Sequence, residues 1–159
     1  MNIRKALTHE APLIQELIRE LALFERAPES AQASLADISG AFFGEHPAVF
    51  CDFIEDEAGQ VQGFAIWFLN YSTWTGTHGI YLEDLFIRSE ARGRGYGKAM
   101  LRHLAALCVE RGYHRLQWWV LDWNTNAIEF YQGFGAQLMD EWTTMRVEGD
   151  ALTRLSAER

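Results

Sequence analysis

Two adjacent carboxylates, Glu83 and Asp84, interrupt the otherwise apolar run of residues 81–87 (YLEDLFI). The run predicts a strand, and neighbouring side chains of a strand point to opposite faces, so at most one carboxylate reaches solvent easily if both faces are covered. The other must be paired or must hold its proton more tightly, because burial raises the pKa of an acid. A raised pKa suits a general base. A structural ion pair, or a bond to loop amides, is the alternative that this pair leaves open.

Three glycines follow at alternate positions of residues 92–97 (RGRGYG), between that strand and an amphipathic stretch that predicts a helix. A helix start offers N–H groups without intrahelical partners and the positive end of the helix dipole, and glycines leave this backbone bare. Such a turn suits a phosphate or pyrophosphate, and Arg92 and Arg94 strengthen that bias. A tight connection without a ligand is the alternative. The spacing matches neither a P-loop nor the G-x-G-x-x-G of dinucleotide folds.

Aromatic residues supply further candidates. Tyr131 lies on the apolar face of a predicted helix, so taken alone it is typical of a core aromatic residue. Beside a thiolate leaving group it could act as an acid, because a phenol with a pKa of about 10 can protonate a thiolate of pKa about 8.5. Trp74 in a polar loop, and Trp142 after two carboxylates in residues 140–142 (DEW), could contact an aliphatic cation.

Length, composition and charge limit the class of protein. A chain of 159 residues predicts a single domain, 1–159, with its own core. The balance of 14 Lys and Arg against 22 Asp and Glu gives a net charge of −8, which argues against a nucleic-acid partner and is compatible with a cationic one. We expect no membrane partner and a cytoplasmic location, because there is no apolar signal region or spanning stretch. Cys51 and Cys108 lack zinc-like spacing, so we expect no metal and two reduced core cysteines.

Hydrophobic periodicity predicts the elements that position these residues. Strands are expected at 2–7, 48–55, 61–70, 78–87 and 115–121, with a hairpin turn at 56–59 and a final strand pair within 137–147. Helices are expected at about 11–25 with Thr8 as a possible cap, at 34–43, at 95–111 before Gly112, at 122–134 and at the C-terminus. Helices between strands after an antiparallel start predict a mixed α/β sheet covered on both faces.

Together these segments resemble a known family. The strand 81–87, the turn 92–97, Asn124 and residues 127–131 (AIEFY) resemble the GNAT acyl-CoA-dependent N-acetyltransferases. Arg92, Gly95 and Gly97 match that family's Q/R-x-x-G-x-G/A signature, and the resemblance covers essentially the whole chain. Within the superfamily, residues 43–47 (FGEHP), 81–84 and 130–131 resemble the diamine acetyltransferase branch, which comprises the spermidine/spermine and thialysine enzymes.

The resemblance implies a mostly antiparallel central sheet with helices on both faces, in which the middle strands near 78–87 and 115–121 splay apart. Acetyl-CoA would lie in that gap as acyl donor, with its pyrophosphate on the amides of residues 92–97. The residues implied in binding this cofactor are Phe86, Ile87, Arg92, Gly93, Arg94, Gly95, Tyr96, Gly97, Lys98, Asn124 and Tyr131.

The resemblance also implies direct transfer of the acetyl group to a primary amine of a small cationic substrate. Glu83 would be the base, through water, Tyr131 would protonate the CoA thiolate, and a backbone N–H near residues 86–88 would polarise the carbonyl. The amine pocket would contain Phe24, Glu25, Trp74, Glu83, Asp84, Asp140, Glu141 and Trp142.

Two departures from the polyamine enzymes bear on the amine. Ser72 stands where those enzymes carry an acidic residue, and Phe24 replaces an aromatic hydroxyl, so we expect a shorter amine such as a lysine-like amino acid. A non-catalytic acyl-CoA sensor and a protein or peptide N-acetyltransferase are the alternatives. The resemblance implies a homodimer, for which the apolar C-terminal strands offer interface material.

Overall fold

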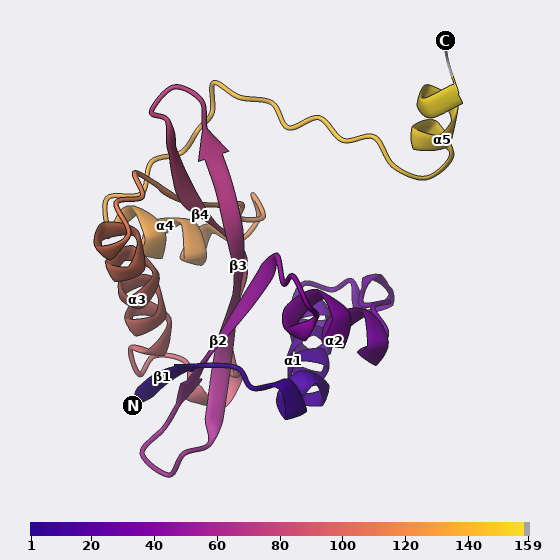
Figure 1. The fold of residues 1–159 in the computed structure, drawn as a ribbon. Coiled ribbons are helices and arrows are strands. Elements are labelled where there is room, and N and C mark those ends of the chain that lie inside the picture. Colours follow the sequence, from indigo (N-terminus) through magenta and orange to yellow (C-terminus); the bar gives the residue numbers. More distant parts are fainter. Residues whose placement is uncertain (158–159) are drawn as a thin grey trace. The chain divides into compact units, whose positions relative to one another are not determined.

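The computed structural model describes residues 1–157, and the chain folds as two compact units, Met1–Trp119 and Val120–Arg159 (Figure 1). The first unit contains the strands β1 (Asn2–Lys5), β2 (Val49–Glu55), β3 (Val61–Ser72), β4 (Thr77–Ile87) and β5 (Leu116–Trp118). Its helices are α1 (Ala11–Phe24), α2 (Leu35–Phe43) and α3 (Tyr96–Glu110), with short 3-10 turns η1 (Thr8–Glu10), η2 (Pro28–Ser30) and η3 (Ser89–Ala91). The second unit contains α4 (Thr125–Gln132) and α5 (Gly149–Ala157). A single domain over residues 1–159 stays a prediction.

The five strands form one sheet in the order β1-β2-β3-β4-β5. Every neighbouring pair is antiparallel except β4 and β5, which are parallel. The β4–β5 ladder covers only Ile80–Leu82 against Leu116–Trp118, although β4 continues to Ile87. The mixed, mostly antiparallel sheet is therefore confirmed, and β4 and β5 part after Leu82 as the expected splay requires.

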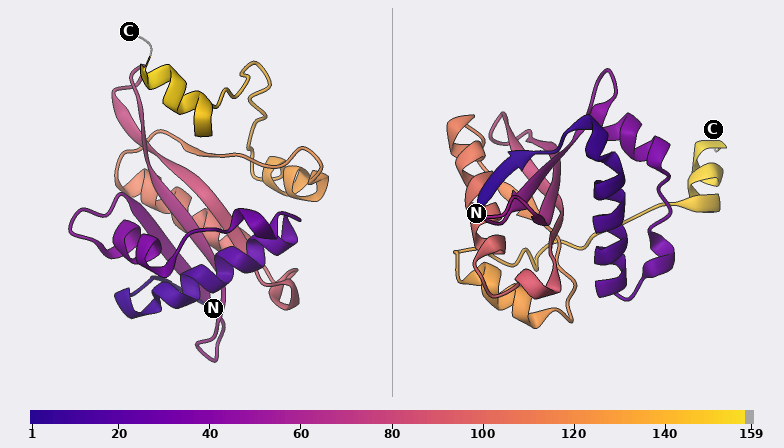
Figure 2. Two further views of the ribbon diagram at one scale, coloured as in Figure 1. Left: turned by 90° about the vertical axis from the view of Figure 1, so that its right-hand side faces the viewer. Right: turned by 90° about the horizontal axis from the view of Figure 1, so that it is seen from below.

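Helices cover both faces of this sheet (Figure 2). On one face α1 and α2 bury an apolar core that includes Ile14 and Leu17 of α1, Phe53 of β2 and Phe64 of β3. On the other face α3 packs against β3 and β4, and its Met100 is fully buried. Each fully buried apolar side chain of this size contributes about 1.5–3 kcal/mol of burial free energy, so the two layers fix the sheet between them.

A buried carboxylate joins α3 to the sheet on that second face. Asp52 of β2 is only 2% exposed. Trp67 Nε1 donates to its Oδ2 at 2.8 Å, and His103 Nε2 of α3 lies 3.3 Å from the same oxygen. Two partners on one buried oxygen offset the desolvation that an unpaired carboxylate would suffer there.

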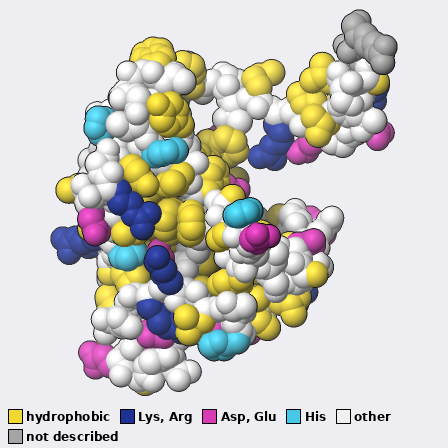
Figure 3. Space-filling view, viewed as in Figure 1, with side chains coloured by type: hydrophobic (Ala, Val, Ile, Leu, Met, Phe, Trp, Pro, Cys, Tyr) yellow, Lys and Arg dark blue, Asp and Glu magenta, His cyan; other side chains and the backbone are white. Residues whose placement is uncertain are grey.

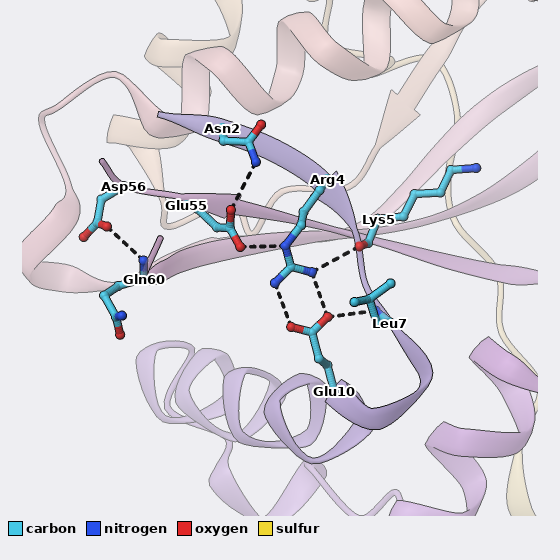
Figure 4. Close-up of polar contacts among 8 residues, drawn as sticks. All are labelled: Asn2, Arg4, Lys5, Leu7, Glu10, Glu55, Asp56 and Gln60. Atoms are coloured by element: carbon cyan, nitrogen blue, oxygen red, sulfur yellow. Dashed lines mark hydrogen bonds and ion pairs between the residues drawn. The ribbon is translucent and has the colours of Figure 1, made fainter. Parts of the chain in front are cut away.

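Arg4 ties the edge strand β1 to its neighbours (Figure 4). Its Nε donates to Glu55 of β2 at 2.6 Å, and its two terminal nitrogens donate to the Glu10 carboxylate at 2.7 Å each. Glu10 also accepts from the Leu7 N–H at 2.8 Å. One guanidinium thus holds β1, β2 and the entry of α1 together, which suits its planar, bidentate geometry.

A β-bulge lies in the middle of β4. Trp67 pairs with Leu82 and Ile66 pairs with Asp84, which leaves Glu83 as an extra residue without a partner in β3. A bulge bends its strand and re-aims the side chain of the extra residue. The same point ends the β4–β5 ladder, so the bulge accounts for the early parting of the two strands.

The structure corrects three expectations about elements. Thr8 does not cap α1: it lies in η1, and the N-cap of α1 is Glu10, which makes no side-chain cap bond. The strand expected at 115–121 spans three residues, because its partner ladder ends at the bulge. The strand pair expected within 137–147 is absent, since these residues are exposed, belong to no ladder and bury no face.

Among residues 1–157, no helix has the length and apolarity needed to cross a bilayer.

Candidate active site

The bulge separates the two adjacent carboxylates of β4. Glu83 is exposed, whereas Asp84 is half-buried. Burial raises the pKa of Asp84 to about 7, and the charges of Glu83 and Glu25 add to the rise. Burial also raises the pKa of Glu25, which follows α1 directly. The carboxylate that holds its proton more tightly is therefore Asp84, expected in the amine pocket, while the catalytic role of Glu83 stays a prediction.

The glycine-rich turn has the backbone that anion binding requires. Gly93 and Gly95 adopt φ angles of +75° and +85°, and a Cβ built on either residue would meet no atom within 4 Å. Gly95 is the N-cap of α3, and no side chain caps this helix end. The first-turn N–H groups of α3 have no intrahelical partner, so they face the space that the glycines leave bare.

The side chains around this turn diverge. Tyr96 is buried at the start of α3, and Lys98 is exposed two residues further on. Arg94 and Tyr96 line a hollow of about 450 Å³ together with residues 56–58 of the β2–β3 turn. Arg92 lines a different pocket, and the joint role of the two arginines at one anion site stays a prediction.

That second pocket joins residues expected in the amine and cofactor sites. It has a volume of about 240 Å³ and is lined by Glu20, Leu23, Phe24, Phe86, Ser89 and Arg92. The Arg92 guanidinium carbon lies 4.2 Å from the centre of the Phe24 ring and 5.6 Å from that of Phe86. Its Nε donates to the Ile87 carbonyl at 2.9 Å. The structure thus brings Phe24, Phe86, Ile87 and Arg92 together.

Arg88 fixes the end of β4 against α1. Its guanidinium donates to Glu16 at 2.5 Å and to Glu20 at 2.9 Å, and its backbone N–H donates to the Gln62 carbonyl of β3 at 2.9 Å. Alternate N–H groups of a strand point to the same neighbour. Because the Arg88 N–H points to β3, the Ile87 N–H points away from β3, toward the side on which β4 and β5 part.

Trp74 lies far from this pocket along the sheet. It occupies the turn between β3 and β4 and is 91% exposed. Hydrophobic side chains are visible at the surface at this end of the hairpin (Figure 3). Glu83 lies six positions after Thr77, the first residue of β4, which is about 20 Å at strand geometry. Within the first unit, Trp74 is therefore not brought to the carboxylates, and its contact with the amine stays a prediction.

The second unit carries the remaining expected residues. Asn124 is the N-cap of α4, and its side chain accepts from the Ala127 N–H at 3.3 Å. Tyr131 lies on α4, where burial raises the pKa of its phenol. A phenol with a raised pKa is fully protonated at neutral pH, as an acid must be before it donates. Asp140, Glu141 and Trp142 are exposed between α4 and α5, and their contact with the amine stays a prediction.

Sequence reasoning missed several residues of the pocket. Glu20, Leu23 and Ser89 line it, and Arg88 donates to the Glu20 carboxylate at 2.9 Å. The spacing of Glu16 and Glu20 places both carboxylates on one helix face, which indicates a cation opposite them. No local pattern identifies that cation as Arg88, because the contact spans 68 residues from Glu20.

Comparison with known proteins places these features in a family. Residues 12–136 match the model of the acetyltransferase (GNAT) family. The chain is 35% identical to an L-ornithine N5-acetyltransferase of Arabidopsis thaliana, over 95% of this chain and 86% of that protein. It is 34% identical to a thialysine N-epsilon-acetyltransferase of Bos taurus, over 98% and 97%.

A solved structure has the same fold as this chain. An integron cassette protein from the mobile metagenome of V. cholerae superposes with a TM-score of 0.82 at 28% identity, covering 99% of this chain and 98% of that chain. The family match spans most of the chain, and both named relatives exceed 30% identity over nearly its full length. The chain therefore belongs to the acetyltransferase (GNAT) family, as the sequence resemblance predicts, and is an amine N-acetyltransferase.

Proposed function

We propose that this chain transfers the acetyl group of acetyl-CoA directly to a primary amine of a small cationic molecule, either a lysine-like amino acid or a diamine. The observation that carries the proposal is an uncapped helix start, α3, reached through η3 and the glycine-rich turn from a bulged strand that presents adjacent carboxylates. The first feature suits a pyrophosphate, and the second suits an ammonium group.

The turn fits the donor. At Gly93 and Gly95 a side chain would enter open space, so the same space accepts phosphate oxygens close to the backbone. The residues proposed to hold the donor are those of the turn and the adjoining helix start, with Phe86 and Ile87 before them and Asn124 in the second unit. When bound, acetyl-CoA would supply the thioester whose carbonyl carbon accepts the amine. The Ile87 N–H, which points away from β3, is the donor we assign to the carbonyl oxygen.

The carboxylates favour a cationic acceptor. Asp84 is close enough to Glu83 and Glu25 for their charges to raise its pKa, so the three groups repel one another when ionised. An ammonium group among them relieves that repulsion, which an uncharged substrate cannot do. Ser72 and Phe24, together with the names of the ornithine and thialysine relatives, favour an amino-acid-type amine over a long polyamine.

Two side chains move protons in the proposed reaction. Glu83, through water, takes a proton from the ammonium group, and the free amine nitrogen then forms a bond to the carbonyl carbon. The carbon–sulfur bond breaks, and the nitrogen loses a second proton to solvent as the amide forms. Tyr131 gives its proton to the departing thiolate and is reprotonated from solvent. Positioning and the polarised carbonyl supply most of the rate, and the acid and the base each contribute about a hundredfold or more.

The remaining expectations complete the proposal. We infer a homodimer, because the second unit exposes large apolar side chains, among them Met145 at 86% and Trp142 at 69%. Sedimentation of the purified protein tests the homodimer, and a monomer at all concentrations contradicts it.

We place the enzyme in the cytoplasm, where Cys51 and Cys108 stay reduced, in keeping with two free thiols. Localisation of the tagged full chain in its native cell tests this.

An amine screen tests the function. The protein is mixed with acetyl-CoA and, in turn, thialysine, ornithine, lysine, putrescine, spermidine or a peptide with a free N-terminus, and thiol release is followed. We expect the highest kcat/KM with one of the three amino acids. Thiol release with the peptide and with none of the other amines would identify a peptide N-acetyltransferase. Binding of acetyl-CoA without release for any amine would identify an acyl-CoA sensor, and either result contradicts the proposal.

A further inference from the structure

Arg92 belongs to the family signature, yet its exposed side chain contacts other residues of the protein. Its Nε donates to the Ile87 carbonyl at 2.9 Å, and its backbone N–H lies 3.3 Å from the Ser89 carbonyl. The guanidinium carbon lies over the Phe24 ring at 4.2 Å and over the Phe86 ring at 5.6 Å. A planar guanidinium held between a carbonyl and two aromatic rings is oriented by the protein itself, so no phosphate is needed to place it.

Phe24 and Arg92 come from opposite parts of the proposed reaction. Phe24 is the last residue of α1, and Glu25 directly after it is one of the carboxylates that raise the pKa of Asp84. Arg92 opens the turn that leads into the uncapped start of α3. The position of the Phe24 ring therefore bears on the carboxylates, and the position of Arg92 bears on the donor turn.

We propose that Arg92 is a positioning residue that couples the amine pocket to the donor turn through the face of Phe24, instead of serving mainly as a phosphate ligand. This inference rests on the proposed function, because it takes the turn as the donor site and the carboxylates as the amine site. Arg88 holds the body of α1 through Glu16 and Glu20, so Arg92 needs to hold only the end of that helix.

A double-mutant cycle tests the coupling. Steady-state constants for the amine and for acetyl-CoA are measured on the wild type, Phe24→Leu, Arg92→Gln and the double variant. We expect each single change to raise the amine KM about two- to fivefold, the range of a partly exposed cation–π contact, with kcat nearly unchanged. The double variant should be no worse than the poorer single variant.

Matched variants control for charge. Arg102→Gln removes the same charge from an exposed position of α3 and should leave both constants unchanged. Arg94→Gln changes the same turn away from Phe24, so it should affect the KM of acetyl-CoA and spare that of the amine. One result would overturn the inference and identify Arg92 as a phosphate ligand. In that result, Arg92→Gln leaves the amine KM unchanged and raises the acetyl-CoA KM by the same factor in the wild-type and Phe24→Leu backgrounds.

The outcome separates this inference from the proposed function. A wild type that acetylates no amine contradicts the function. Thermal unfolding of the same four proteins then decides the inference, because non-additive changes in Tm support the contact and additive changes refute it.

Discussion

The raised pKa of Asp84 predicts how stability depends on pH. Burial raises this pKa from 3.8 to about 7, with added repulsion from Glu83 and Glu25. The folded state then holds a proton that the unfolded state releases, so the free energy of unfolding falls as the pH rises from about 4 through about 7. Asp84→Asn keeps the shape of the side chain and removes this dependence.

The magnitude follows from the size of the shift. About three pKa units correspond to about 4 kcal/mol. Part of the side chain reaches solvent, which screens the penalty, so we expect about half, or about 2 kcal/mol. At pH 8, Asp84→Asn should therefore be more stable than the wild type by about 2 kcal/mol, with Tm higher by about 4–8 °C. The difference should shrink toward zero as the pH falls to about 4 and below, because Asp84 is then increasingly protonated in both states.

Thermal and urea unfolding between pH 4 and pH 9 measure this difference. Glu83→Gln should give a smaller gain of the same sign, because its charge is a secondary contributor to the shift. Glu57→Gln removes one negative charge from the exposed β2–β3 turn and should show no pH-dependent gain. Parallel stability curves for Asp84→Asn and the wild type, or a less stable variant at pH 8, would refute the reasoning.

Three further predictions concern the donor turn, the acid and the amine site. Tyr131→Phe should lower kcat about a hundredfold with little change in the acetyl-CoA KM, and an unchanged kcat across the full pH profile would exclude Tyr131 as the acid. Gly95→Ala should lower the free energy of unfolding, measured in urea, by about 1–2 kcal/mol, because the φ angle of residue 95 is +85° even though a Cβ there meets no atom. Gly40→Ala, inside α2 with equal room for a Cβ, should be neutral or stabilising, and equal losses in the two variants would contradict the backbone argument. The kcat/KM for the amine should rise through about pH 7 as Asp84 ionises, and the same rise in Asp84→Asn would assign the titration to another group.

The sequence predicts most elements of the first unit, because the residues that start and end them lie within or next to those elements. The Ser34–Asp37 capping box starts α2, and the positive φ of Gly112 follows the end of α3. The alternation of a strand also predicts that Glu83 and Asp84 face differently. It does not predict which of them is buried, because a two-residue period cannot reveal an extra residue, and the bulge depends on the register with β3.

Long-range contacts limited the prediction elsewhere. The spacing in residues 92–97 predicts an anion site with two arginines, but the sequence does not show that Arg92 stacks on Phe24, 68 positions earlier in the chain. The apolar residues within 137–147 suggested strands, yet a strand exists only where a partner ladder and a buried face are available. The family resemblance supplied what neither periodicity nor spacing could, namely the chemistry that these positions share.

The contact between His103 and the buried Asp52 fixes the position of α3, and with it that of the turn proposed to bind the donor. His103 lies seven residues after the first residue of α3, or about 10 Å along the helix axis. If α3 slid by one helical turn, His103 would move about 5 Å from the carboxylate, so this contact fixes the position of the helix along the sheet. The direction of a helix dipole follows its axis. The alignment of the proposed pyrophosphate site therefore depends on a side chain on the opposite face of the sheet from Asp84. In the proposed reaction, the carboxylates that would face the amine and the helix start that would face the donor are therefore positioned by different layers of the fold.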